Sequence, residues 1–244
     1  MRKPDIRALT SSAKAGSLTA QCKLASHYFN LKTARGTQKA MPWLLSAAKQ
    51  GDRWAQYSLG YVYDKGEGVR KNRRLAIRYY ELSANQGYCS AQLNLGIILA
   101  NLPGESRDLE RAVLLYRRAA KQGNKNACWN LGSYYETGRG VPKNNRKSFR
   151  WYLRAAELGE VEAQNTVGWS YHEGCGVKRN FESAVYWYRK SAKEGNESAQ
   201  YNLGLCYLDG DGVITSQRWA IYWLKIAAKN GNSKAGEVLS EMIA

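Results

Sequence analysis

The feature that most constrains this chain is a sequence period of 36 residues that runs through almost its whole length. A glycine keeps this period from Gly51 to Gly231. An alanine keeps it too, with one shorter step of 35 residues at the beginning, at Ala20, Ala55, Ala91, Ala127, Ala163, Ala199 and Ala235. Periods of about 20 to 50 residues are typical of repeat architectures, in which each unit buries its apolar face against its neighbours. The chain is therefore expected to be a stack of similar units.

Each unit predicts two helices joined by a glycine turn. In the first helix an apolar residue and a glycine precede a tyrosine, as in Val167, Gly168 and Tyr171. A glycine inside a helix costs about 1 kcal/mol relative to alanine, so its recurrence indicates that a neighbouring helix passes too close for a side chain. The turn at 174–177 ends this helix, because glycine tolerates the positive φ of a helix C-terminus. The second helix carries small residues and one packing position, at Trp43, Tyr79, Leu115, Trp151, Trp187 and Trp223.

These units resemble the Sel1-like repeat, a relative of the tetratricopeptide repeat with a longer turn. The resemblance covers about residues 20 to 244 and implies an all-α fold, a right-handed α-solenoid of stacked antiparallel helix pairs. The first unit lacks the Gly-x-Gly turn between Asn30 and Gln38, and the third has Leu102-Pro103-Gly104-Glu105 in its place. We expect a capping helix at each end, at 1–19 and 235–244, and six Sel1-like repeats between them, at 20–54, 55–90, 91–126, 127–162, 163–198 and 199–234.

Positive charge dominates the composition. The chain has 37 Lys and Arg against 20 Asp and Glu, which gives a formal net charge of +17 and a pI near 9.7. Such a charge favours acidic partners but does not bear on the fold. Five cysteines without a C-x-x-C pair indicate reduced thiols. The first residues contain no apolar run typical of a secretory signal, and no stretch is long and apolar enough for a membrane span, so we predict a cytoplasmic protein.

Residues that could carry catalysis are few. The two histidines, His27 and His172, lie four repeats apart, and the chain has no G-x-S-x-G or Walker-type motif. His172, Glu173 and Cys175 lack the paired spacing of a zinc site, so His172 is interpreted as an exposed side chain at a helix end. The glycine turns follow helices instead of strands, which disfavours phosphate binding. We therefore predict no catalytic residue, no metal and no cofactor, and expect that the protein is not an enzyme.

The first helices carry one stripe of packing residues, with the opening alanine, the glycine and the tyrosine, and a second stripe that contains the candidate binding residues. It comprises the positions two and six residues after the opening alanine, which share a helical face because they lie four residues apart. The resemblance to Sel1-like repeats implies that this stripe lines the concave groove of the superhelix. Two interpretations are open: the rings bind a partner, or they pack between adjacent first helices. The predicted groove residues are Tyr57, Tyr61, Leu93, Ile97, Trp129, Ser133, Asn165, Trp169, Tyr201 and Leu205.

Basic residues gather after the turns and at the beginning of the second helices. Because the period is fixed, we expect these clusters to align along one edge of the solenoid. They are either a solvated outer face or an electrostatic footprint for an acidic partner. This basic edge comprises Arg70, Lys71, Arg73, Arg74, Lys143, Arg146, Lys147, Arg150, Lys178 and Arg179.

The leading hypothesis is a non-enzymatic adaptor or scaffold that holds a protein partner, with an acidic surface, in the concave groove. The charged rims would set its orientation and association rate. A narrower form is a bacterial immunity-type inhibitor of an acidic toxin or effector. The alternative is a basic solenoid that binds nucleic acid along its edge, which the charge alone supports, because no recognition motif accompanies it.

Overall fold

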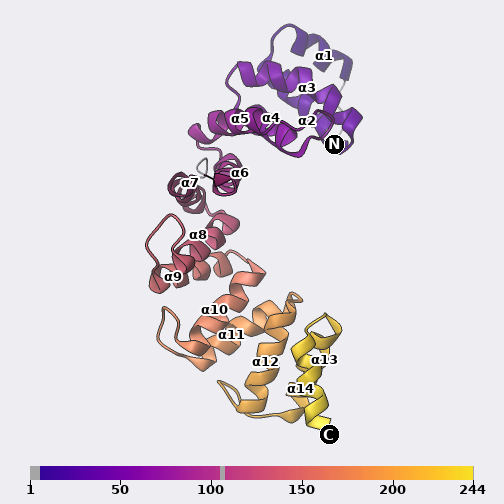
Figure 1. The fold of residues 1–244 in the computed structure, drawn as a ribbon. Helices are drawn as coiled ribbons and strands as arrows, with labels where there is room; N and C mark the ends of the chain where they lie inside the picture. The colour runs from indigo at the N-terminus through magenta and orange to yellow at the C-terminus, as the bar shows by residue number, and fades with distance from the viewer. Residues whose placement is uncertain (1–5, 105–107, 244) are drawn as a thin grey trace. The chain divides into compact units, whose positions relative to one another are not determined.

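The computed structural model describes residues 6–104 and 108–243, and in this part of the chain every regular element is a helix (Figure 1). Fourteen helices follow one another along these residues. They are α1 (Ile6–Lys14), α2 (Leu18–Phe29), α3 (Ala34–Lys49), α4 (Arg53–Lys65), α5 (Arg73–Asn85), α6 (Cys89–Ala100), α7 (Leu109–Lys121), α8 (Lys125–Thr137), α9 (Asn145–Glu157), α10 (Val161–Glu173), α11 (Phe181–Lys193), α12 (Glu197–Asp209), α13 (Gln217–Lys229) and α14 (Ser233–Ile243). Glu105, in the altered turn of the third repeat, lies outside the described residues.

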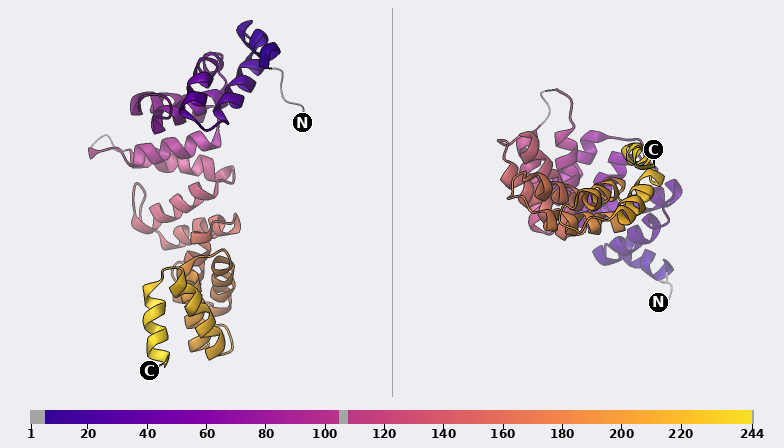
Figure 2. Two further views of the ribbon diagram at one scale, coloured as in Figure 1. Left: turned by 90° about the vertical axis from the view of Figure 1, so that its right-hand side faces the viewer. Right: turned by 90° about the horizontal axis from the view of Figure 1, so that it is seen from below.

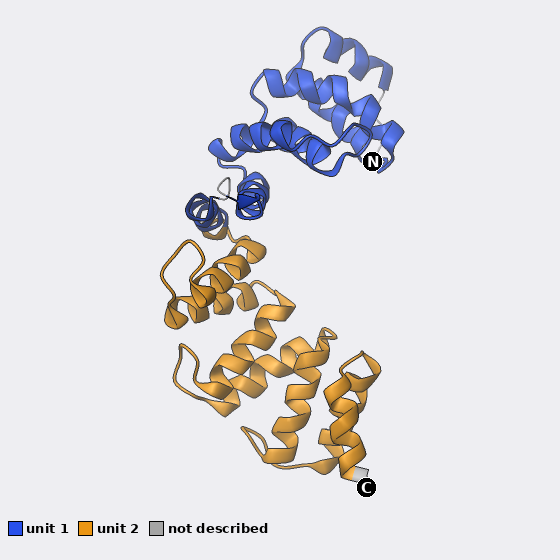
Figure 3. Cartoon of the chain, viewed as in Figure 1, with its two compact units in different colours: residues 1–119 blue, residues 120–244 orange. Residues whose placement is uncertain are grey.

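The helices pack in sequential pairs. The first and second helices of one repeat lie side by side, as α4 with α5 and α10 with α11, and within each unit a second helix also packs on the helix that follows it, as α5 on α6 and α11 on α12. The chain divides into two compact units, residues 1–119 and residues 120–244, and within each the pairs are stacked in chain order (Figures 2 and 3). The predicted all-α solenoid of stacked helix pairs is therefore confirmed.

Side-chain caps and glycines set the helix boundaries. In the four repeats with a Gly-x-Gly turn, an Asn or Ser caps the second helix, such as Asn180, whose Oδ1 accepts a hydrogen bond from the Ser183 backbone N–H at 2.7 Å. In the same repeats the first helix ends at a left-handed glycine, such as Gly174 with φ 76°. The Asn180 N–H then donates to the Tyr171 carbonyl at 2.9 Å and closes the turn. Equivalent bonds at Asn72, Asn144 and Ser216 give the same loop in the other repeats with a Gly-x-Gly turn.

The glycine inside the first helix makes room for an aromatic ring in four of the repeats. A Cβ atom on Gly168 would lie 2.6 Å from Cδ1 of Tyr188, a ring from the second helix of the same repeat. Gly60, Gly96 and Gly132 face Tyr80, Tyr116 and Tyr152 in the same way, and Gly204 faces Leu224. The expectation of a close neighbour is thus correct, but the neighbour is a side chain and not a helix backbone.

The aromatic position predicted on the second helix packs against the core, but the residue that follows it is the more deeply buried of the two in most repeats. Tyr80, Tyr152 and Tyr188 are buried, whereas the preceding residues Tyr79 and Trp151 are only half-buried. Trp43 and Trp223 are also half-buried, and only Leu115 and Trp187 are buried as predicted. The physical reason is the gap left by the glycine, which is filled by the ring that points directly at the first helix.

In every repeat except the fourth, a buried glutamine of the first helix bonds to the end of the helix before it. The Gln56 amide donates to the Ala48 carbonyl at the end of α3, at 3.2 Å, and the Gln200 amide donates to the Ala192 carbonyl at the end of α11, at 3.0 Å. These bonds satisfy carbonyls that a helix C-terminus leaves without an intrahelical donor. The glutamines therefore fix the register between neighbouring repeats.

Both ends of the stack are covered by a helix. In the first unit Ala13 of α1 is buried beside Leu24, and in the second unit Ala235 of α14 is buried beside Leu224 and Ala227. All five cysteines are free thiols. Among the described residues, no helix is long and apolar enough to cross a membrane.

Candidate binding surfaces

The two stripe residues of the second repeat, Tyr57 and Tyr61, line an aromatic cleft of about 470 Å³. The other lining residues are Phe29, Asn30, Lys32 and Glu67. The Tyr61 ring lies 6.2 Å from the Phe29 ring at nearly a right angle, and its hydroxyl donates to Glu67 Oε1 at 3.3 Å. Burial, and then the nearby Glu67 carboxylate, raise the pKa of Tyr61. A neutral phenol therefore stands at the edge of the cleft with its ring available to a ligand.

Tyr57 is more enclosed than Tyr61. Its ring is 5.0 Å from that of Tyr88 and 5.9 Å from that of Tyr80, and burial raises its pKa. In the next repeat Leu93 is 8% exposed, whereas Ile97 is 40% exposed. In the first unit, therefore, the first position of each stripe pair serves packing more than the second does.

The second unit shows the same division. Trp129 packs its ring 4.7 Å from that of Tyr152, the tyrosine that fills the glycine gap of the same repeat. The Asn165 Oδ1 accepts a hydrogen bond from the Asn202 amide at 3.1 Å. Trp169, in contrast, is 42% exposed, while Ser133 and Leu205 are half-buried. Trp169 is thus the most open aromatic side chain of the predicted stripe.

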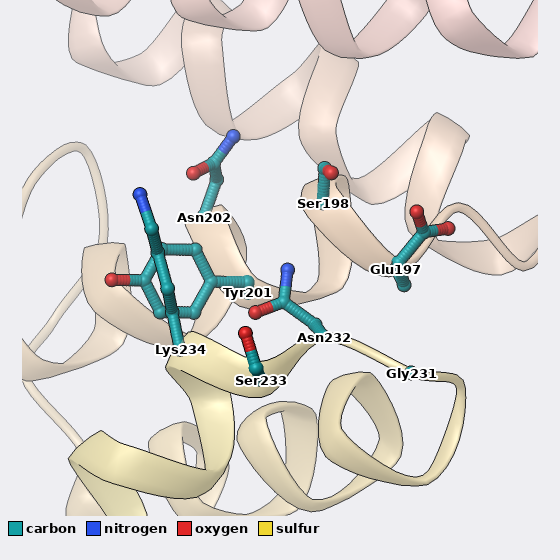
Figure 4. Close-up of a pocket in the computed structure, with 8 residues that line it drawn as sticks. All are labelled: Glu197, Ser198, Tyr201, Asn202, Gly231, Asn232, Ser233 and Lys234. Carbon is teal, nitrogen blue, oxygen red and sulfur yellow. The ribbon is translucent and has the colours of Figure 1, made fainter.

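Tyr201 lines a polar pocket of about 390 Å³ near the C-terminus. Figure 4 shows Tyr201 and Asn202 of α12 on one side of this pocket and Asn232 and Lys234, from the beginning of α14, on the other. The remaining lining residues are Glu197, Ser198, Gly231 and Ser233. The stripe therefore continues to the last helix, but its lining becomes polar there.

All ten residues of the basic edge are exposed. Lys147 lies over the Tyr135 ring at 5.5 Å, and Arg179 lies over the Phe181 ring at 5.8 Å, so two of the cations have aromatic partners. Arg146, Arg150 and Lys178 instead line a cleft of about 520 Å³ in the second unit, together with Phe149, Gly174, Gly176 and Val177. Cations from two successive repeats, the fourth and the fifth, therefore line one cleft.

His172 is not the exposed side chain that the sequence predicts. Its Nδ1 lies 2.9 Å from Glu173 Oε1 and its Nε2 lies 3.0 Å from Asp211 Oδ2, with the side chain only 29% exposed. The ring also meets Phe181 edge-on at 5.1 Å. The imidazole thus joins the end of α10 to the turn of the next repeat. Within the described ranges, no group of three His, Cys, Asp or Glu side chains could hold a metal ion.

Sequence reasoning missed two kinds of residue. Phe29 and Lys32 lie in the one repeat whose turn is shorter, so the period could not place them beside Tyr61. Phe149 and Val177 look like ordinary core residues, and only the structure places them beneath the cations of the second unit. For the first pair the irregular turn itself was the available signal.

Stacked helix pairs with open surfaces define an all-helical repeat scaffold. The Sel1 repeat family matches six successive segments, at residues 18–52, 55–88, 89–124, 125–160, 161–196 and 197–232. The chain belongs to the Sel1 repeat family. Each matched segment begins at or near the first residue of a first helix.

Two solved structures are similar over most of this chain. A protective antigen present in uropathogenic Escherichia coli strains, which displays an SLR fold, is 34% identical with a TM-score of 0.90, over 99% of this chain and 53% of that one. This chain therefore spans about half the length of the E. coli protein. A Sel1 repeat protein from Oxalobacter formigenes is 37% identical with a TM-score of 0.80, over 88% of each chain.

A more distant structure, an immunity protein from Pseudomonas aeruginosa, is 16% identical with a TM-score of 0.50, over 86% of this chain and 82% of that one. At this identity the likeness concerns the fold alone. Comparison with curated proteins gives no match.

Proposed function

We propose that this chain is a non-enzymatic scaffold that binds a protein partner along the first-helix stripe. The observation that carries the proposal is the aromatic cleft of the first unit, where Phe29, Tyr57 and Tyr61 surround a preformed space beside Lys32. Aromatic side chains contribute much of the binding energy at protein interfaces, because they bury a large area and lose little conformational entropy. A cleft with three rings, beside the opposite charges of Lys32 and Glu67, suits an apolar side chain with a polar neighbour.

Trp169 supports the same proposal in the second unit. An indole that is 42% exposed leaves apolar surface in water, and a partner that covered it would gain the free energy of that burial. The net charge of +17 favours a partner with an acidic surface and would accelerate its association. The narrower hypothesis, an immunity-type inhibitor of an acidic toxin or effector, rests on this charge and on no further observation. A cytoplasmic location also stays a prediction.

The test uses the immobilised protein as bait in a lysate of its native host, with mass spectrometry of the captured proteins. Two stripe positions are changed, the half-buried Tyr61 and the exposed Trp169, each to Ala, since truncating the packed Trp129 would disturb the fold. Trp219→Ala is the matched control, because Trp219 is 48% exposed but lies on a second helix. We expect one partner to be lost with the stripe variants and retained with the control. Equal capture by all the variants would refute binding at the stripe.

The alternative, nucleic-acid binding, draws on the ten exposed cations of the basic edge. It predicts that the logarithm of affinity for a duplex falls steeply with the logarithm of salt concentration. Charge reversal of Lys143, Arg146, Lys147 and Arg150 should flatten this dependence. A filter-binding titration that detects no duplex binding at low salt would exclude the alternative.

A further inference from the structure

We propose that the cleft between α9 and the turn that follows α10 is a second binding site, which takes an acidic side chain together with a neighbouring apolar one from a protein partner. The site lies in the second unit and shares no residue with the first-helix stripe. The inference rests on the proposed function in one respect, namely that the occupant is a segment of a protein.

The turn of the fifth repeat builds one wall of this cleft. Gly176 has a φ of 74°, and a Cβ atom there would collide with the carbonyl group of Asn145, so the turn lies directly against the first residue of α9. Val177 and Lys178 follow this contact. The close approach that glycine permits therefore carries Lys178 to the same cleft as Arg146 and Arg150, which lie one helical turn apart on α9.

The three cations have no counter-charge in the structure. Within residues 6–104 and 108–243, no salt bridge joins Arg146, Arg150 or Lys178 to a carboxylate, and none of the three lies over an aromatic ring as Lys147 and Arg179 do. Like charges four residues apart on a helix repel one another, so this grouping does not stabilise α9. A bound carboxylate would relieve the repulsion, and an arginine can hold it through two parallel hydrogen bonds.

The floor of the cleft decides which anion fits. Phe149 is buried, with its ring 5.2 Å from that of Tyr171, and Val177 is half-buried, so the surface beneath the cations is apolar. A phosphate backbone gains nothing from an apolar floor, and nucleic-acid bases need an open ring face on which to stack, which the buried Phe149 does not offer. A carboxylate side chain beside a leucine or a phenylalanine matches both parts of the cleft.

Another repeat has the same turn geometry with different chemistry. In the second unit Gly212 packs on the carbonyl group of Phe181 at the beginning of α11, as Gly176 packs on Asn145. The residues that correspond to Arg146, Arg150 and Lys178 in that place are Glu182, Tyr186 and Ile214. The turn in the first unit is not comparable, because Gly68 packs on Ala34, three residues before the position that corresponds to Asn145. Stacking therefore does not require three cations, and another cause must account for them.

A defined peptide tests the site. The probe is a fluorescein-labelled octapeptide of alternating Asp and Leu, titrated by fluorescence anisotropy at about 150 mM salt. The cleft variant combines Arg146→Gln, Arg150→Gln and Lys178→Gln. The control variant, Lys71→Gln with Arg73→Gln and Arg74→Gln, removes the same charge from exposed positions of the first unit. We expect the cleft variant to weaken peptide binding at least tenfold and the control to weaken it less than twofold, while both keep the wild-type circular dichroism.

Three outcomes would overturn the assignment. Equal loss in the two variants would mean that net charge alone attracts the peptide. Equal affinity for a peptide of alternating Asp and Ser would remove the role of the apolar floor. Displacement of the labelled peptide by a 20-residue oligo(dT) at lower concentration than by unlabelled peptide would assign the cleft to nucleic acid. The Trp169→Ala variant should bind the peptide normally, so a failure of the stripe proposal would be seen separately, in the capture experiment.

Discussion

The glycine inside the first helix gives an unusual prediction, because alanine should destabilise the protein at one glycine and stabilise it at another. In an open helix, replacing glycine with alanine gains about 1 kcal/mol. At Gly168, however, the new Cβ would lie 2.6 and 2.7 Å from two carbons of the Tyr188 ring, which is 2% exposed and has nowhere to move. Overpacking of a close-packed core costs about 1 to 3 kcal/mol, and a rigid, enclosed ring belongs at the upper end of this range. The expected net effect of Gly168→Ala is a loss of about 2 kcal/mol.

Gly236 provides the matched control. It lies inside α14, and nothing would come within 4 Å of a Cβ atom there. Gly236→Ala should therefore stabilise the protein by up to about 1 kcal/mol. Urea denaturation followed by helical circular dichroism gives both changes, read as shifts of the midpoint, since a repeat protein can lose its units separately.

A double-mutant cycle isolates the contact. In a Tyr188→Ala background the ring is gone, so Gly168→Ala should change sign and stabilise the protein. A neutral or stabilising effect of Gly168→Ala in the otherwise unchanged protein would refute the reasoning. So would a loss that persists unchanged in the Tyr188→Ala background.

Three further predictions concern single positions. Glu194→Gln should stabilise the protein by about 1 kcal/mol in urea denaturation, because the new amide can donate to Gln164 Oε1, which is buried without a partner. Gln86 donates to Gln56 in the same way, at 2.8 Å. Glu197→Gln removes the same charge and should not stabilise the protein. Asn180→Ala should cost about 1 kcal/mol in the same assay, since it removes the acceptor for the Ser183 N–H, and an unchanged midpoint would contradict this. Burial, and then Asp211, raise the pKa of the Cys206 thiol from 9.0 to about 12, so the folded state holds this proton more tightly than the unfolded state does. The contribution of the protonated Cys206 thiol to the free energy of unfolding is present below pH 9.0 and is lost as the pH rises towards about 12. In the Cys206→Ala variant the urea midpoint should therefore fall less steeply between about pH 8 and 10.5 than in the unchanged protein.

The sequence alone predicted the elements of this fold well, because the stack imposes the same demands on each unit. The positive φ of Gly174 and the cap at Asn180 recur in the four repeats with a Gly-x-Gly turn, so the period reveals them. The period does not show which of two adjacent residues points at the gap. Spacing alone therefore selects the position of Tyr79, although Tyr80 is the ring that faces Gly60.

The candidate sites were less predictable for a related reason. A stripe defined by helical spacing treats all its members alike, but Leu93 is buried while Trp169 is 42% exposed. The difference depends on which neighbouring rings cover each position, and these come from other helices. The basic edge was visible as a run of cations, yet the apolar floor that Phe149 and Val177 place beneath three of them is a property of the packing.

Function in a scaffold of this kind must be sought where one repeat departs from the others. Ser133 occupies in the fourth repeat the position that Trp169 occupies in the fifth, and the helix pairs α8 with α9 and α10 with α11 pack in the same way. Stacking therefore tolerates a serine and does not require an indole there. The exposed part of the Trp169 indole gains no burial from the fold, and a partner that covered it would supply that burial. The same reasoning applies to Arg146, Arg150 and Lys178, because Glu182, Tyr186 and Ile214 accompany an equivalent turn one repeat further along the chain. At both places the backbone repeats while the chemistry does not, and we propose that these unrepeated side chains serve binding.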